Sequence, residues 1–136
     1  MAKPRQSYHH GDLRQALIAA GIAILSENGA GALTLRAAAA RAGVSHAAPA
    51  HHFGSLQGLL TAIAAEGFER FHAAIDAAMA EAPSSPAARL RAAGEAYVGF
   101  ATTHPAIVEL MFSGSRLDWS DAGLCSAADR AYGQLE

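Results

Sequence analysis

The sequence of 136 residues has little of what marks secreted and membrane proteins. Cys125 is its single cysteine, so no internal disulfide can form and nothing indicates an oxidising compartment. No apolar run approaches the roughly 18 residues that span a bilayer, and the start of the chain lacks the apolar block of a secretory signal. We therefore expect a cytoplasmic protein with no membrane partner.

Motifs of catalysis and metal binding are missing as well. The chain has no nucleophile elbow, no phosphate-binding glycine loop and no spaced carboxylate pair that stands out from solvated charge. His9 and His10 are adjacent, as are His51 and His52, whereas helical metal ligands stand three or four residues apart. We expect no enzymatic activity, no cofactor and no metal site.

Long alternating runs of β-branched and aromatic residues, which would indicate strands, are also missing. Hydrophobic residues make up 51% of the chain, and Ala, Leu, Ile and Glu recur throughout. Because these residue types favour helices and are numerous enough to form a core, the sequence predicts an all-α fold.

Charge is distributed unevenly along the chain, although the formal net charge is only -2. Residues 1–55 hold five Lys and Arg against two Asp and Glu, and residues 56–136 hold five against ten. Five of the seven histidines also lie in the basic part. A basic head on an acidic body indicates a nucleic-acid-binding face on the first part only.

The basic part has the pattern of three helices behind a short arm. Residues 1–8 are polar and basic and are expected to form a mobile arm, and residues 11–28 have apolar positions along one helical face. Thr34 can cap a second helix that Gly43 stops, and Ser45 can cap a third. Two short helices joined by a glycine-containing turn are the layout of a helix-turn-helix.

The acidic part has the pattern of further helices. Gly54-Ser55 precedes a long helix over 56–81, and Ala82–Pro86 is the clearest linker. Ser85 and Pro86 begin the next helix, which runs to about Thr103. A short helix over 107–112 and a last helix from near Ser120 follow. We expect a helix-turn-helix domain over 1–55 and a helical domain over 56–136. The second domain is expected to be incomplete, because its last helix is still running where the sequence stops.

The helix-turn-helix segment has four specific features, which are a Thr-Leu-Arg opening at 34–36, an Ala-Gly-Val-Ser turn at 42–45, a His-Phe ending at 52–53 and a Leu-Leu pair at 59–60. In these features it resembles the DNA-binding domain of the tetracycline-repressor (TetR) family of bacterial regulators. The likeness covers about the first 70 residues, and HPAIVELMF at 104–112 is similar to the C-terminal domain of one branch of the family.

The resemblance implies a homodimer that binds a palindromic operator in double-stranded DNA and is released by a small-molecule effector. Base contacts would carry specificity and phosphate contacts mainly affinity. The residues that it places near bases are Ser45, His46, Ala47 and His51, and those near phosphates are Lys3, Arg5, Tyr8, Thr34, Arg36 and His52.

Several features depart from the family pattern. Ala50 stands where the family usually has a tyrosine and Leu56 where it usually has a lysine, so each loss should weaken contact with the DNA backbone. Pro49 lies within the reading helix, in the fourth position after its expected cap, where it removes one amide. Family members also usually continue with the helices that form the dimer interface.

An effector pocket would lie in the helical domain, which we expect to bind the ligand and to dimerise. Tyr97 and His104 are the best candidates because each brings a polar tip to an apolar setting, although ordinary core packing is the alternative for any single residue. The complete set of candidates is Phe68, Phe71, Tyr97, Phe100, His104 and Met111.

Two other functions remain open from the sequence. One is a helical interaction protein that derives from such a regulator and no longer binds an operator, which Ala50, Leu56 and the short C-terminal part favour. The other is a small helical module that binds a ligand or metal with no effect on DNA. The leading hypothesis is a repressor released by an effector.

Overall fold

The computed structural model of the protein describes residues 6–133 and the side chains of residues 11–133. All regular elements in this part are helical, which confirms the predicted all-α fold. The elements are α1 (Gln6–Asn28), η1 (Ala30–Ala32), α2 (Leu35–Ala42), α3 (Ala48–Phe53), α4 (Leu56–Glu81), α5 (Pro86–Thr103), α6 (Pro105–Met111), η2 (Gly114–Arg116) and α7 (Ala122–Gly133).

Hydroxyl caps set the starts of three helices, as the sequence predicts. The Oγ atoms of Thr34, Ser55 and Ser85 each accept a hydrogen bond from the backbone N–H three residues later, at 2.9, 3.1 and 3.1 Å. Each bond satisfies one of the amides that the first turn of a helix leaves without a partner. The predicted starts of α2, α4 and α5 are therefore confirmed.

Two predicted boundaries in the N-terminal part are wrong. The predicted arm over 1–8 ends earlier, because α1 begins at Gln6 and includes Tyr8. Ser45 does not cap the third helix, which begins at Ala48 with Ala47 as its N-cap. Pro49 explains the shift, since it cannot donate the amide hydrogen bond that a helix capped by Ser45 would require of it.

Two starts in the C-terminal part also differ from the prediction. The short helix α6 begins at Pro105 rather than residue 107, because proline fits the first helical turn. The last helix begins at Ala122 rather than near Ser120, since Asp121 Oδ2 accepts a hydrogen bond of 2.9 Å from the N–H of Leu124. An aspartate in this position acts as a cap.

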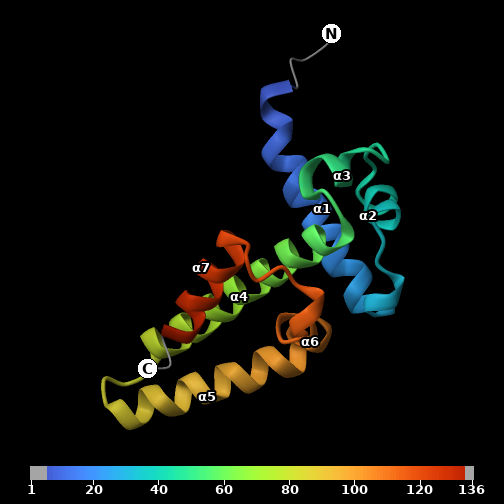
Figure 1. Ribbon diagram of the computed structural model, residues 1–136. Helices are drawn as coiled ribbons and strands as arrows, with labels where there is room; N and C mark the ends of the chain where they lie inside the picture. Colours follow the sequence, from blue (N-terminus) through green and yellow to red (C-terminus); the bar gives the residue numbers. More distant parts are fainter. Residues whose placement is uncertain (1–5, 134–136) are drawn as a thin grey trace.

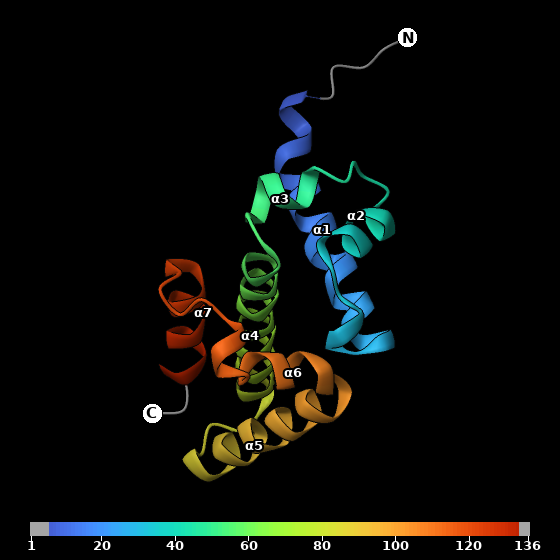
Figure 2. The same cartoon turned by 45° about the vertical axis from the view of Figure 1, so that its right-hand side comes forward.

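The long helix α4 joins the two parts of the molecule. It contacts α1 and α3 near its start and α5, α6 and α7 along the rest of its length. The helices α1, α2 and α3 gather at its N-terminal end, α5 and α7 lie along it, and α6 lies between α5 and the N-terminal helices (Figures 1 and 2). A movement of α4 would therefore affect both parts.

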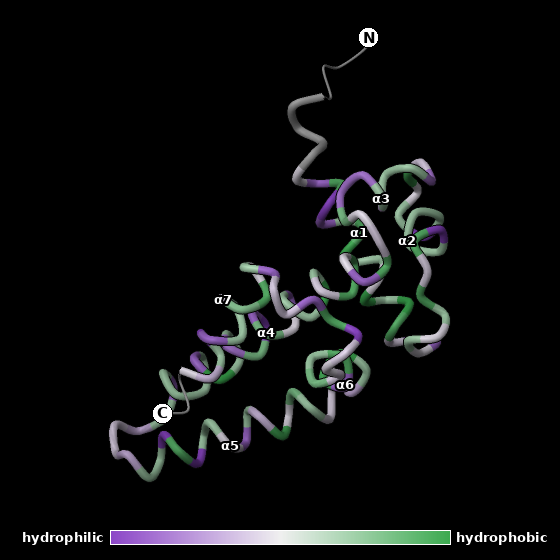
Figure 3. Tube along the Cα trace, viewed as in Figure 1, coloured by the Kyte–Doolittle hydropathy of each residue, from purple (hydrophilic) through white to green (hydrophobic). Residues whose placement is uncertain are grey.

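One hydrophobic core extends through the N-terminal helices and the body. Its fully buried members on α4 include Leu59, Ile63 and Ile75, which meet Leu17 of α1 and Leu124 of α7 in the same cluster. Hydrophobic and hydrophilic stretches alternate along α4, α5 and α7 (Figure 3), as expected for helices that bury one face. Within the described residues, no helix is both long and apolar enough to cross a membrane.

Gly67 is the point of closest packing between α4 and α6. A Cβ atom at this position would lie 2.8 Å from Cγ2 of Ile107 and 2.9 Å from Sδ of Met111. Both neighbours are almost completely buried and have little room to move. The missing side chain thus allows the two helices to approach.

We predict that Gly67→Leu lowers the free energy of unfolding by about 1–3 kcal/mol, because the larger side chain overpacks the α4–α6 contact. Gly94→Ala is the matched control, since a Cβ atom there meets nothing within 4 Å. This control should stabilise the protein by about 0.5–1 kcal/mol through helix propensity. Urea denaturation of the two variants measures both effects, and equal stability of Gly67→Leu and wild type would contradict the packing argument.

Candidate nucleic-acid interface

The turn between α2 and α3 is built on Gly43. This residue has φ +70° and ψ +33°, in the left-handed region that favours glycine. The N–H of Gly43 donates to the carbonyl oxygen of Ala40 at 3.2 Å, and that of Val44 donates to Ala39 at 3.0 Å. These bonds close the end of α2 and redirect the chain toward α3.

Small and apolar residues hold α2 and α3 in place. Ala38 and Ala39 are completely buried, which lets α2 pack closely on its neighbours. Pro49 on α3 is also fully buried, and Val44 and Phe53 pack against the core. One side of the α2–α3 pair is therefore buried against the rest of the protein, and the opposite side faces solvent.

The end of α3 packs against both α1 and α4. The Arg14 guanidinium of α1 lies 4.8 Å from the centre of the Phe53 ring, a cation–π contact. A Cβ atom on Gly58 of α4 would lie 1.9 Å from the Phe53 carbonyl oxygen, so only glycine fits there. The position of α3 thus depends on both helices. Neither Arg14 nor Gly58 belongs to the helix-turn-helix pattern, so the sequence did not indicate their role.

An ion pair fastens α2 to the end of α1. Nη1 and Nη2 of Arg41 donate to Oε1 and Oε2 of Glu27 at 2.9 and 2.6 Å, which is the bidentate geometry of a strong pair. The hydrogen bonds from Arg41 lower the pKa of Glu27, and the same bonds raise the pKa of Arg41. Arg41 is consequently engaged within the protein, whereas Arg36 is in no ion pair with a described residue.

Most of the predicted DNA-contacting residues that the structure describes are exposed. Arg36, Ser45, His46, Ala47 and His51 are exposed, and His52 is half-buried with its ring 5.3 Å from that of His51. A cavity of about 310 Å³ is lined by Leu13, Ser45, Ala47, Ala48, His51 and His52, so the structure brings four of the predicted residues together.

Of the other predicted DNA contacts, Thr34 lies apart from this group and three belong to the N-terminal segment. Thr34 is exposed, but its hydroxyl caps α2 and lies beside Leu56 and Gln57 in another cavity of about 550 Å³. Tyr8 lies in the first turn of α1, where side chains are outside the described part. Lys3 and Arg5 lie outside the described residues. Within the described part, no group of three or more His, Cys, Asp or Glu residues is placed to hold a metal ion.

Comparison with known proteins identifies the N-terminal part. Residues 17–63, from α1 into α4, match the family described as bacterial regulatory proteins, tetR family. The chain carries a tetR-family domain. Regulators of this family bind DNA and control transcription, and the matched residues contain the whole α2–turn–α3 unit. No curated protein matches the chain.

Solved structures share the fold beyond this tetR-family domain. A protein of unknown function from Rhodococcus sp. RHA1 is 40% identical, with a TM-score of 0.80 over 95% of this chain and 66% of that one. A TetR family transcription regulator from Marinobacter aquaeolei VT8 is 16% identical, with a TM-score of 0.70 over 96% and 68%. The multidrug binding protein EbrR, complexed with imidazole, is 25% identical, with a TM-score of 0.57 over 98% and 70%. The chain therefore spans about two thirds of the length of these proteins.

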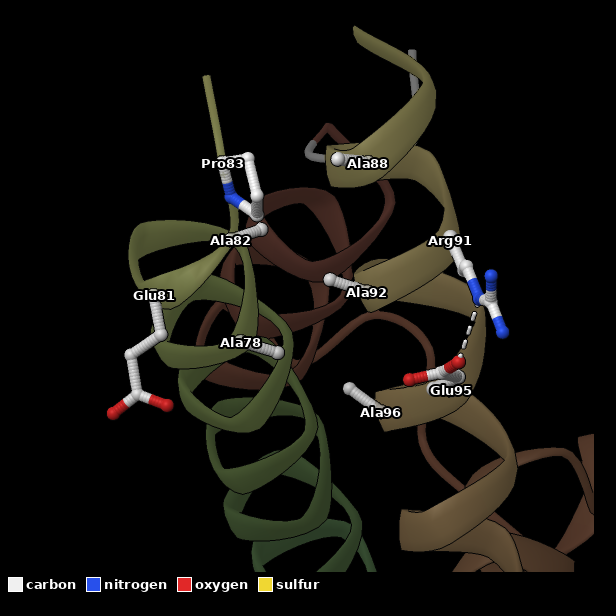
Figure 4. Close-up of a pocket in the computed structure, with 9 residues that line it drawn as sticks. All are labelled: Ala78, Glu81, Ala82, Pro83, Ala88, Arg91, Ala92, Glu95 and Ala96. Atoms are coloured by element: carbon white, nitrogen blue, oxygen red, sulfur yellow. Dashed lines mark hydrogen bonds and ion pairs between the residues drawn. The ribbon is translucent and has the colours of Figure 1, made fainter. Parts of the chain in front are cut away.

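The predicted effector residues divide into two groups beyond the tetR-family domain. Phe71, Tyr97, Phe100 and His104 form a series of ring contacts, with the Phe71 centroid 5.3 Å from Tyr97 and 5.5 Å from Phe100. Phe68 and Met111 are buried in the core. These six residues do not line the cavity of about 530 Å³ between the end of α4 and the start of α5, whose walls are mainly alanine (Figure 4).

Aromatic side chains that were outside the predicted set cover Phe68. The rings of Phe112, Trp119 and Tyr132 lie 5.9, 6.4 and 5.9 Å from the Phe68 ring, and each of the three is exposed by 42–50%. Burial, with a smaller contribution from Tyr97, raises the pKa of Tyr132.

We predict that the Glu27–Arg41 pair stabilises the protein in a pH-dependent way. Because the pKa of Glu27 is lower in the folded state, its contribution is present at neutral pH and is lost as the pH falls through that lowered pKa. The Glu27→Gln variant should therefore melt at a lower temperature than wild type at pH 7, and the difference should shrink as the pH falls below 4.5, the ordinary pKa of a glutamate side chain. Thermal melts across this range measure it.

Glu109→Gln serves as the control for this experiment. Glu109 is exposed on α6 and forms no ion pair with a described residue, so its substitution should leave the pH dependence unchanged. A melting-temperature difference for Glu27→Gln that stays constant from pH 7 to pH 3 would count against the ion pair as its source.

Proposed function

We propose that this chain is a transcriptional repressor that reads operator DNA through α2 and α3 and is released by a small molecule. The observation that carries the proposal is the match of residues 17–63 to the tetR family on a segment that folds as two helices around the left-handed Gly43. We assign residues 1–55 to DNA binding and residues 56–136 to effector binding and dimerisation. Cytoplasmic location stays a prediction.

The exposed face of α3 and its preceding turn supplies the base contacts. In a helix-turn-helix, residues near the start of the second helix enter the major groove. Ser45, His46, Ala47 and His51 are exposed there. Thr34, Arg36 and His52, together with Lys3, Arg5 and Tyr8, are assigned to phosphates, where they contribute affinity without specificity.

The first test of this function is a fluorescence-anisotropy titration against the DNA upstream of the gene and a scrambled duplex. We expect a preference of roughly a thousandfold or more for the upstream DNA, with affinity that falls as salt rises. Equal binding to both duplexes would reject specific recognition by this chain.

Two substitutions separate the proposed roles of phosphate and base contacts. Arg36→Ala should weaken binding to all duplexes uniformly and reduce the slope of log affinity against log salt by about 1. His51→Ala should instead reduce the preference for the upstream DNA, because it removes a side chain assigned to a base. Arg91→Ala, at an exposed position of α5 outside the tetR-family domain, is the control. The assignment fails if Arg36→Ala and Arg91→Ala behave alike.

The aromatic residues around α4 are the proposed effector site. Phe68, Phe71, Tyr97, Phe100, His104 and Met111 supply an apolar surface, and the half-exposed rings of Phe112, Trp119 and Tyr132 extend it. Nδ1 of His72, four residues after Phe68 on α4, is buried and has no hydrogen-bond partner in the described part. The multidrug binding protein EbrR, with its bound imidazole, supports an aromatic small molecule as effector.

Homodimer formation is proposed from the likeness to the family. The outer side of α5 exposes Leu90 by 76% and Val98 by 59%, and apolar residues exposed in this way are typical of contact surfaces. Dimerisation would place two reading heads on a palindromic operator.

One observation favours a second function, that of an interaction protein with no operator. Ala50 is exposed on α3 and Leu56 is 36% exposed at the start of α4, at positions where the family pattern has tyrosine and lysine. Two side chains that would contact the DNA backbone in the family pattern are therefore replaced by small or apolar ones. The anisotropy titration separates the two functions, because an interaction protein would bind both duplexes equally weakly.

A further inference from the structure

A polar cavity lies where the tetR-family domain meets the helical body. Its volume is about 250 Å³. It is lined by residues of α1, α3, α4, the segment between η2 and α7, and the start of α7, which are Arg14, His52, Phe53, Gly58, Thr61, Ala62, Ala65, Asp118, Asp121 and Gly123. The cavity is distinct from the aromatic cluster proposed above.

Small residues create the space. Gly58, Ala62 and Ala65 lie at helical spacing on the side of α4 that lines the cavity, and Gly123 lies on α7 opposite. Thr61 is only 3% exposed and fixes the wall, because its Oγ1 donates to the carbonyl oxygen of Gln57 at 2.7 Å and accepts from the N–H of Asp118 at 3.0 Å. The wall that carries Asp118 is thereby held against α4.

The cavity is lined by charges of both signs that form no ion pair with each other. Asp118 and Asp121 precede α7 and Arg14 belongs to α1; all three residues are exposed, Arg14 lies over the Phe53 ring, and none of the three forms an ion pair within 4.0 Å with a described residue. Asp118 stays ionised, because hydrogen bonds from Ser120 lower the pKa of its carboxyl group. Oδ2 of Asp121 caps α7. Both carboxylates are therefore fixed in place.

We propose that this cavity binds a small zwitterion, with its cationic group toward Asp118 and Asp121 and its anionic group toward Arg14. A ligand with both charges supplies the counter-charge that each side lacks, whereas a ligand of one sign would meet repulsion from the other side. The volume matches a molecule the size of an amino acid.

The bound molecule would act on the reading helix directly. His52 and Phe53, the last residues of α3, line the cavity, and His52 is also assigned to phosphate. Occupation of the cavity therefore changes the affinity for DNA. This part of the inference rests on the proposed function, whereas binding of the zwitterion does not.

Isothermal titration calorimetry of the whole chain tests the site with three probes of one size. The probes are 4-aminobutanoate, butylamine and butanoate, which carry both charges, the cation alone and the anion alone. We expect saturable binding of 4-aminobutanoate with one site per chain and an affinity at least tenfold above that of either control. Absence of saturation at millimolar concentrations, or equal affinity for all three, would overturn the proposal.

Charge-neutral variants locate the binding. The double variant Asp118→Asn, Asp121→Asn keeps an oxygen for the bonds to Ser120 and Leu124, and Arg14→Gln removes the opposite charge. Each variant should lower the affinity for 4-aminobutanoate at least tenfold. Asp129→Asn, at an exposed position of α7 outside the cavity, should leave this affinity unchanged. Wild-type affinity in both charge variants would overturn the assignment.

A filled cavity gives an independent check that leaves the charges in place. Ala62→Leu should abolish binding of 4-aminobutanoate, and Ala80→Leu, exposed on the same helix, should not. Anisotropy with DNA then separates the two proposals. Binding of the zwitterion without specific DNA binding removes the proposed function alone, and specific DNA binding without binding of the zwitterion removes this inference alone.

Discussion

The buried side of α4 is the constraint on which the rest of the molecule depends. Leu59 and Ile63 lie in the core beside the N-terminal helices, and Phe68 and Ile75 continue that core into the body. Each fully buried side chain of this size contributes about 1.5–3 kcal/mol of transfer free energy. Because these residues share one helix, the two parts of the chain pack on one rigid element and cannot move independently of it.

This arrangement fixes the reading helix at its far end. Helix α3 has only six residues, too few to hold its position by its own hydrogen bonds. Phe53 is held between Arg14 of α1 and Gly58 of α4, and Pro49 is buried beneath the helix. The direction of the exposed histidines thus follows from the packing of neighbouring helices.

The segment between η2 and α7 connects the body with the same region. Trp119 packs on Phe68, whereas Asp118, one residue earlier, donates its N–H to Thr61 near the start of α4. Asp118 and Asp121 then face the cavity that also contains His52. A change at the aromatic cluster and a change at this polar cavity would both reach the segment between η2 and α7, so it is a physical link between the two proposed ligand sites.

Local sequence was sufficient to predict an all-α chain, the starts of α2, α4 and α5, and a helix-turn-helix formed by the second and third helices. Caps such as Thr34, Ser55 and Ser85, and a left-handed glycine at 43, act through neighbours within a few residues, so the pattern is sufficient. The start of α3 differs from the predicted one, because Pro49 lies four residues after Ser45. Proline cannot donate the amide hydrogen bond that a helix capped by Ser45 would need there. Which groups meet across the chain depends on tertiary packing instead. The Arg14–Phe53 contact, the Glu27–Arg41 pair and the charged cavity join residues from separate helices, and local sequence does not encode how those helices pack.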